Sequence, residues 1–184
     1  MSKEPGIAAQ IIRQGGEVVV IALVGLGLQS LWTTHWLSAQ AFCLVVVAVA
    51  FAKTVFFFVE NLQHILMATQ DDMPYHRVLG LMGVNMAQIT LAFALDFWCL
   101  EVAEPASFSE IDAAWTKGEQ LFEFFFFSVL NFSFFGFGDV TPQTIPAKLI
   151  TMMEVLLAFF TVIFLLSDFV SLKDSLRVRK REEK

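Results

Sequence analysis

The chain has 184 residues, of which 57% are hydrophobic and only 16% are charged. An average soluble domain carries about 25% charged residues, so this composition indicates a membrane protein and argues against a soluble domain. The formal net charge of −6 gives no indication of a nucleic-acid partner, and the length allows a few spanning helices and little else.

The first apolar run covers residues 17–32 and follows a charged arm at residues 1–16. We expect the arm to be either a short amphipathic helix on the inner membrane surface or a disordered end. A signal peptide is the alternative for the run, because Ala39-Gln40-Ala41 resembles a cleavage site. Trp32 and Trp36 favour a retained spanning helix, since tryptophan gathers at membrane interfaces.

The second apolar run, residues 41–59, contains a charged residue, Lys53. A lysine near the middle of a bilayer costs about 2.5–3.5 kcal/mol, so Lys53 is expected to face protein or water. Its candidate partners are Glu60, two turns further along the same helix face, and Asp96 in the third run. Either Lys53 snorkels or pairs to hold helices together, or it serves sensing or an ion pathway.

Residues 61–77 form a polar segment that we interpret as a hydrated cytoplasmic linker, with Pro74 marking the break before the next helix. Glu60 and His64 are spaced to share one helix face, but no further ligands accompany them, so no metal site is predicted. Cys43 and Cys99 fall inside apolar runs and are expected to be free buried thiols. A disulfide between them is the alternative.

The third apolar run covers residues 78–100 and leads into an acidic segment, residues 101–120. Within that segment, Ser109-Glu110-Ile111-Asp112 resembles a helix start. The acidity either solubilises an outer loop or concentrates cations at an outer mouth. Residues 119–133 follow as an apolar segment that is too short to span, which predicts a re-entrant helix.

A glycine-containing stretch, residues 131–142, separates this short segment from the last apolar run. Gly136 and Gly138 allow positive φ on alternate residues, which can turn successive carbonyls to one side. A ring of such carbonyls can replace the water around a dehydrated cation. The alternative is an ordinary outer turn, because Gly-Asp and Thr-Pro are common turn dipeptides.

The fourth apolar run, residues 147–170, carries Glu154 and Asp168 and precedes a basic tail. Most basic residues fall in the N-terminal arm, the middle segment and the tail: Lys3, Arg13, Arg77, Lys173, Arg177, Arg179, Lys180, Arg181 and Lys184. Only Lys117 and Lys148 fall on the other side. The positive-inside rule therefore predicts four spans with both termini cytoplasmic and the glycine stretch outside.

From about residue 77 to residue 170 the chain resembles the two-helix pore domain of the potassium channel family. That family reads Phe-Ser, then Thr-Thr-Val-Gly-Tyr-Gly-Asp-x-x-Pro. This chain reads Phe127-Ser128, then Ser133-Phe134-Phe135-Gly136-Phe137-Gly138-Asp139-Val140-Thr141-Pro142. The resemblance implies an outer helix, a re-entrant pore helix, a filter loop and an inner helix in this part, and it does not extend to the first half of the chain. With the first two apolar runs, this predicts an all-α membrane protein of four transmembrane helices, with the re-entrant pore helix and filter loop between the third and fourth. The predicted divisions are an arm (1–16), a two-helix segment with its linker (17–76), a pore domain (77–172) and a basic tail (173–184).

The same resemblance assigns a selectivity filter to Phe134, Phe135, Gly136, Phe137, Gly138 and Asp139. It places the end of the pore helix at Asn131 to Ser133. Phe134 stands where the family has a threonine that coordinates the innermost ion, and Ala158 stands at the family's hinge glycine. We expect the Phe134 ring to pack behind the filter against Phe132 or Phe127, with an axis-facing ring as the alternative. Candidate inner-pore or intramembrane charges are Lys53, Glu60, Asp96, Glu154 and Asp168.

The function implied by the resemblance is a homotetrameric, potassium-type cation channel in the plasma membrane. Its partners are the lipid bilayer and monovalent cations, with potassium at the filter and no resident cofactor, metal or nucleic acid. No nucleophile–base pair or metal box suggests an enzyme. The alternative is a non-conducting or weakly selective membrane subunit or sensor that keeps the pore fold.

Overall fold

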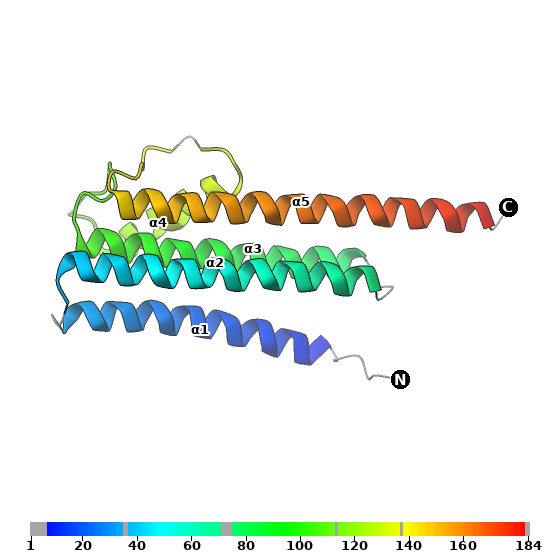
Figure 1. Ribbon diagram of the computed structural model, residues 1–184, viewed down its shortest axis with the longest axis horizontal. Coiled ribbons are helices and arrows are strands. Elements are labelled where there is room, and N and C mark those ends of the chain that lie inside the picture. Colours follow the sequence, from blue (N-terminus) through cyan, green and yellow to red (C-terminus); the bar gives the residue numbers. More distant parts are fainter. Residues whose placement is uncertain (1–6, 35–36, 71–74, 113, 137, 183–184) are drawn as a thin grey trace.

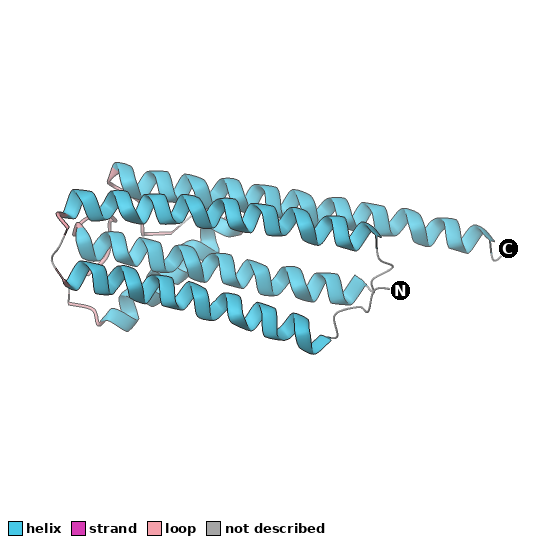
Figure 2. Cartoon of the chain, turned by 60° about the horizontal axis from the view of Figure 1, so that its bottom comes forward, coloured by secondary structure: helices cyan, strands magenta, loops and turns pink. Residues whose placement is uncertain are grey.

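The computed structural model describes residues 7–34, 37–70, 75–112, 114–136 and 138–182, which form helices and no strand. The helices are α1 (Ile7–Thr33), α2 (Ala39–Gln70), α3 (Tyr75–Ala103), α4 (Lys117–Phe132) and α5 (Ile145–Glu182). The four long helices run side by side, and the short α4 packs near the end where α5 begins (Figures 1 and 2). The fold is therefore all-α, as the sequence predicts.

Three helices contain stretches that are long and apolar enough to cross a membrane: Ala39–Gln63, Gly80–Ala103 and Ile145–Leu166. A spanning helix needs about 20 apolar residues at 1.5 Å each. Helix α1 carries a shorter apolar stretch, Val19–Thr33. Helix α4 has only 16 residues, too few to cross a bilayer. These lengths define an all-helical membrane protein in which one helix is too short to span.

Helix α3 is the central helix of the fold. Its apolar stretch is 67% buried, whereas those of α2 and α5 are each 28% buried. It contacts all four of the other helices. An aromatic cluster joins it to α4 through the rings of Phe97 and Phe127, whose centroids are 5.2 Å apart. Phe108, after α3, packs edge-on against Phe124 of α4 at 5.0 Å. These contacts fix the short helix against the central one.

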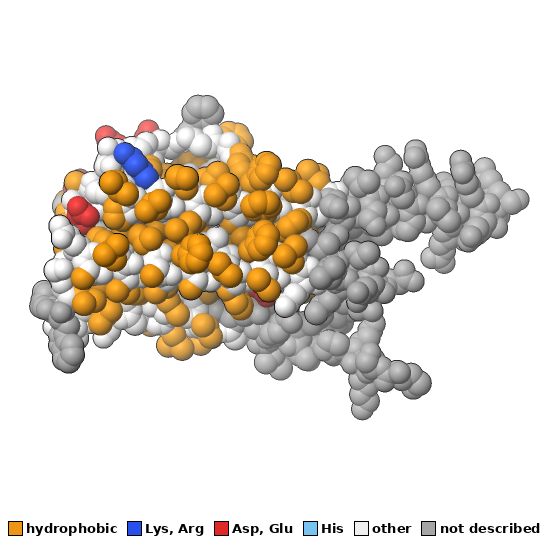
Figure 3. All heavy atoms as spheres, in the orientation of Figure 1, with side chains coloured by type: hydrophobic (Ala, Val, Ile, Leu, Met, Phe, Trp, Pro, Cys, Tyr) orange, Lys and Arg blue, Asp and Glu red, His pale blue; other side chains and the backbone are white. Residues whose placement is uncertain are grey.

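Large apolar side chains cover the outer faces of α2 and α5 (Figure 3). Phe56 on α2 and Met152 and Phe159 on α5 are each more than half exposed in the single chain. The charged side chains visible on this face gather mainly near the end where α5 begins. Apolar patches of this extent are unusual on a soluble monomer, and they suit a surface that lipid or further protein covers.

The polar segment 61–77 is mostly helical in the structure, and its predicted hydration and cytoplasmic location stay predictions. Helix α2 continues to Gln70, and α3 already begins at Tyr75. Apolar composition ends near residue 60, but leucine, methionine, alanine and glutamine are good helix formers, so the backbone ladder continues. Residues 71–74 lie outside the described residues.

The cysteines are free thiols, as the sequence predicts. Both Cys43 and Cys99 are buried and unpaired in the structure.

The predicted helix start at residues 109–112 is also wrong. Helix α4 begins at Lys117, and Thr116 is its N-cap. Glu110 has φ of 60°, in the left-handed region, which no α-helix contains. Ser109 uses its side chain to contact Thr141 and not to cap a helix. The correct capping box lies seven residues later, at Thr116 and Glu119.

Candidate pore loop and the groups behind it

Helix α4 starts with a complete capping box. The Thr116 hydroxyl accepts from the Glu119 backbone N–H at 3.3 Å, and the Glu119 carboxylate accepts from the Thr116 backbone N–H at 2.7 Å. These bonds to Thr116 hold the pKa of the exposed Glu119 carboxyl below its usual range. A negative charge here also suits the positive end of the helix. The capping box therefore fixes where this short helix begins.

The C-terminal end of α4 is a Schellman motif. Ser133 is the C-cap, the Phe134 N–H donates to the Asn131 carbonyl at 3.1 Å, and the Phe135 N–H donates to the Leu130 carbonyl at 3.0 Å. The motif requires a left-handed residue after the cap, and glycine usually supplies it. Here Phe134 supplies it with φ of 57°. A left-handed backbone costs a non-glycine residue roughly 1–2 kcal/mol.

The loop that follows alternates in backbone handedness. Phe134 has φ of 57° and Gly136 has φ of 60°. The alternation is therefore present, but it begins at Phe134, ahead of the glycine pair from which the sequence inferred it. At Gly138 the lack of a side chain avoids a close contact, because a Cβ there would lie 3.0 Å from Cδ1 of Leu130. Phe137 lies outside the described residues.

The Phe134 ring does not pack behind the loop within the chain, contrary to expectation. Its side chain is 48% exposed, and Phe135 is 68% exposed. Phe127 and Phe132, the expected packing partners, belong to a buried cluster that does not include Phe134. The left-handed turn directs the chain away from that cluster as soon as α4 ends. Both phenylalanines thus present their rings on the surface of the single chain.

The segment after the loop is tied to the turn that follows α3. Gln143 donates its N–H to the Ser107 carbonyl at 2.8 Å, and Ser109 donates its N–H to the Thr141 carbonyl at 2.9 Å. The Ser109 hydroxyl also lies 3.2 Å from the Asp139 carbonyl oxygen, to which it donates. The Glu101 carboxylate accepts from the N–H of Phe108 at 3.0 Å and braces this turn. Sequence analysis missed these contacts, since it assigned the acidic segment a charge and a helix start but no hydrogen bonds to the segment after the loop.

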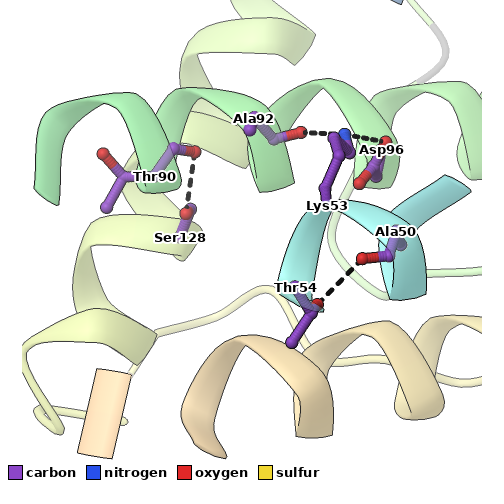
Figure 4. Close-up of polar contacts among 7 residues, drawn as sticks. All are labelled: Ala50, Lys53, Thr54, Thr90, Ala92, Asp96 and Ser128. Carbon is purple, nitrogen blue, oxygen red and sulfur yellow. Dashed lines mark hydrogen bonds and ion pairs between the residues drawn. The ribbon is translucent and has the colours of Figure 1, made fainter. Parts of the chain in front are cut away.

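A buried carboxyl group, Glu154 of α5, lies against α4 behind the loop. Asn131 donates its side-chain amide to Glu154 Oε2 at 3.0 Å, and the Ser128 hydroxyl makes a short contact with Glu154 Oε1. The Ser128 hydroxyl also reaches the Thr90 carbonyl oxygen at 2.9 Å (Figure 4). Glu154 is fully buried, so within the chain it faces α4 and not an open surface. Asp168, the other carboxyl group of the fourth apolar run, has its side chain outside the described part.

Lys53 pairs with Asp96 across the interface of α2 and α3. Its Nζ lies 2.6 Å from Asp96 Oδ1 and 3.1 Å from the Ala92 carbonyl oxygen (Figure 4). The Lys53 side chain is 15% exposed and the Asp96 side chain 1% exposed. Of the two partners that the sequence left open, the structure selects Asp96. Glu60, two turns further along the same face of α2, is also buried.

A buried amide network joins α2, α3 and α5. Asn85 donates to the Asn61 side-chain oxygen, and Asn61 donates to the Thr161 hydroxyl at 2.8 Å. Sequence analysis placed Asn61 in a hydrated linker and therefore missed this network. The available signal was the presence of isolated amide side chains in or beside apolar helices. Among the described side chains, no cluster of three or more His, Cys, Asp or Glu could hold a metal ion.

The structure combines spanning helices with a short helix that ends in a left-handed turn. A glycine-containing loop follows this turn and is hydrogen-bonded back to the turn after α3. These features define a pore-loop membrane protein. The model of a family described as "Ion channel" matches residues 85–173. Over these residues the chain therefore matches a pore domain of the two-helix, potassium-channel-like type, and α3 and α5 flank the pore loop. Neither the curated proteins nor the solved structures compared with the chain gave a match.

Proposed function

We propose that the chain forms a homotetrameric, potassium-type cation channel that conducts through carbonyls of residues 134–139. The observation that carries this proposal is the alternating handedness at Phe134 and Gly136, directly after the end of α4. Alternating handedness turns successive carbonyls toward one side, where they can take the place of an ion's water. One chain supplies a single such loop, so a ring of carbonyls requires several copies around one axis. Permeant potassium is the expected occupant, and no resident cofactor is needed.

The electrostatics of the pore domain favour a cation. The C-terminal end of α4 carries the partial negative charge of the helix dipole at the start of the loop. Exposed carboxylates on the α3–α4 connection, Glu104, Glu110 and Asp112, add negative charge on the same end of the bundle. Charges of one sign around a mouth raise the local concentration of the opposite ion. In a tetramer the exposed apolar faces of α5 and α2 are the surfaces for neighbouring copies and lipid.

The proposed location is the plasma membrane with both ends of the chain in the cytoplasm. Support comes from the helix ends, since α1 begins and α5 ends on the side of the bundle opposite the pore loop (Figure 1). The basic residues of the sequence gather toward that same side. A cysteine label at exposed Thr34 or Asp112 should react from outside intact cells, and one at Gln70 should not. Reversed reactivity would contradict this orientation.

In this proposal the pore domain occupies residues 77–172. It is preceded in the sequence by the arm (1–16) and the two-helix segment (17–76) and followed by the tail (173–184). The Asn61–Thr161 bond and the Lys53–Asp96 pair tie the two-helix segment to the pore domain. The first two helices thereby act as a brace of the pore domain within each subunit.

A non-conducting or weakly selective subunit is the second candidate, favoured by the exposed ring of Phe134 where the family has a hydroxyl. An apolar ring raises the desolvation barrier for an arriving ion. Purified protein in liposomes separates the two functions through paired potassium and sodium flux, with Gly136→Ala as the matched control. Potassium flux that exceeds sodium flux and is lost in the variant supports the channel. An intact tetramer with no flux of either ion supports the second candidate.

A further inference from the structure

The groups behind the pore loop form one continuous chain of contacts. It runs from the Thr90 carbonyl oxygen through the Ser128 hydroxyl and the Glu154 carboxyl group to the Asn131 amide. The members come from α3, α4 and α5, and all four residues are buried. Each keeps at most 9% of its surface exposed, so the polar atoms of these side chains bond chiefly to one another.

Ser128 has one hydroxyl hydrogen for two contacts, one with the Thr90 carbonyl oxygen at 2.9 Å and one with Glu154 Oε1. A carbonyl oxygen can only accept, so the contact with Thr90 is a hydrogen bond only when Ser128 donates to it. The short contact between Ser128 and Glu154 Oε1 then has a hydrogen only if the carboxyl group supplies it. The Asn131 amide donates to the other carboxyl oxygen at 3.0 Å. An ionised Glu154 would instead leave two acceptors facing each other at one of the Ser128 contacts.

The charges around Glu154 also disfavour its ionised form. From α3, Asp96 contributes a negative charge, and Lys53 of α2 is already committed to Asp96 at 2.6 Å. Among the side chains that the structure describes, no lysine or arginine forms an ion pair with Glu154. On α4, Lys117, Glu119 and Glu123 lie in the first two turns, and on α5 Lys148 is exposed. A buried charge without a partner is strongly disfavoured.

We propose that Glu154 is neutral and acts as a hydrogen-bonded latch that positions the end of the pore helix. The proposal rests on the proposed channel function. Glu154 holds the side chain of Asn131, and the Asn131 carbonyl accepts the Phe134 N–H at 3.1 Å in the turn that begins the loop. The latch therefore connects α5 to the first left-handed residue of the loop. Glu154 is a positioning residue, since it acts on the loop through Asn131.

The first test is infrared spectroscopy of the purified assembly in liposomes at neutral pH. A neutral Glu154 gives a carbonyl stretch of a protonated carboxyl group, which E154Q removes and the control D96N retains. Asn131→Leu should keep this band and shift it to higher wavenumber, because the carbonyl oxygen loses its donor. Absence of a band that E154Q removes would overturn the proposal. This readout does not depend on flux, so it decides the state of Glu154 even if the protein does not conduct.

The second test is potassium flux in the same liposomes. Glutamine reproduces the neutral pattern, since its amide donates to Ser128 and its oxygen accepts from Asn131, so E154Q should retain most of the wild-type flux. E154L leaves the buried Asn131 amide without its acceptor, a loss of about 1–3 kcal/mol, which corresponds to about 5- to 150-fold. We expect E154L to lose flux and selectivity with the tetramer intact; if it does not assemble, Ser128→Ala replaces it with the same expectation. Equal loss in E154Q and E154L would overturn the positioning role.

Discussion

The Phe135 backbone N–H donates to the Leu130 carbonyl at 3.0 Å, and this bond closes the turn that places Phe134 in the left-handed region. The loop thus leaves α4 at a sharp angle and at one defined residue. A phenylalanine carries this strain where glycine is usual. Strained residues of this kind persist where the surrounding structure over-determines them, often at functional sites.

Replacing Phe134 with glycine should stabilise the fold, because glycine adopts this φ without the steric penalty. The expected gain in the free energy of unfolding is about 1 kcal/mol. Denaturation of the detergent-solubilised protein measures it, and Phe135→Gly is the matched control, since Phe135 has no positive φ. The control should lose stability. Phe134→Thr should be less stable than Phe134→Gly because a β-branched residue fits this region poorly. Equal stability of all variants would contradict the strain at this position.

Changing either glycine of the loop to alanine should abolish flux, for a different structural reason at each position. A Cβ at Gly136 meets no atom within 4 Å but stands on a left-handed backbone, whereas a Cβ at Gly138 meets Leu130 Cδ1 at 3.0 Å. We therefore expect flux to be lost in both variants. Leu130→Ala should restore flux to Gly138→Ala by making room and should not restore it to Gly136→Ala. Rescue of both variants, or of neither, would contradict this division.

The Lys53–Asp96 pair should show strong energetic coupling. Removing one partner leaves a buried charge unpaired, which typically costs about 3–5 kcal/mol of stability. The double variant Lys53→Met with Asp96→Leu should recover most of this loss. A double-mutant cycle on thermal unfolding measures the coupling. A cycle between Lys53 and Glu60 is the comparison and should show less coupling, because Lys53 bonds Asp96. No coupling between Lys53 and Asp96 would refute the pairing.

Acid should weaken the start of α4 through Glu119. The pKa of Glu119 is lower in the folded chain than its ordinary value, owing to the bonds from Thr116. The stabilisation is therefore fully present above the ordinary pKa of a glutamate and is lost as the pH falls through the folded-state value. Amide hydrogen exchange at residues 117–120 measures it as the pH is lowered. Glu119→Gln should remove the acid dependence, and an unchanged profile in that variant would show that another group titrates.

Hydropathy and motif spacing predicted the all-α membrane fold, the short helix and the loop that follows it. The boundaries of α2 and α3 were not predictable in this way, because good helix formers extend a helix past its apolar stretch. The strain at Phe134 was hidden for a related reason: the sequence signal for a left-handed turn is glycine, and none stands there. Sequence left the partner of Lys53 open because both candidate carboxylates suit a lysine chemically, and only helix packing decides between them.

The groups behind the loop were the hardest to foresee. Glu154 was recognisable as an intramembrane carboxyl group, but its contacts come from Ser128 and Asn131, residues of a different helix. Their meeting depends on the rotation of α4 against α5, which hydrophobic periodicity does not determine for a helix that is apolar almost all round. The Asn61–Thr161 bond has the same origin in the packing of α2 on α5.

In the proposed channel, the loop after α4 lines an ion pathway shared by four copies of the chain. A density map of the purified assembly in lipid, determined with potassium present, tests this arrangement. We expect a fourfold axis that passes the loops, with ordered ions on the axis beside the Gly136 carbonyls. An assembly in which the loops lie apart from any symmetry axis, or in which no ion is ordered beside them, would contradict it.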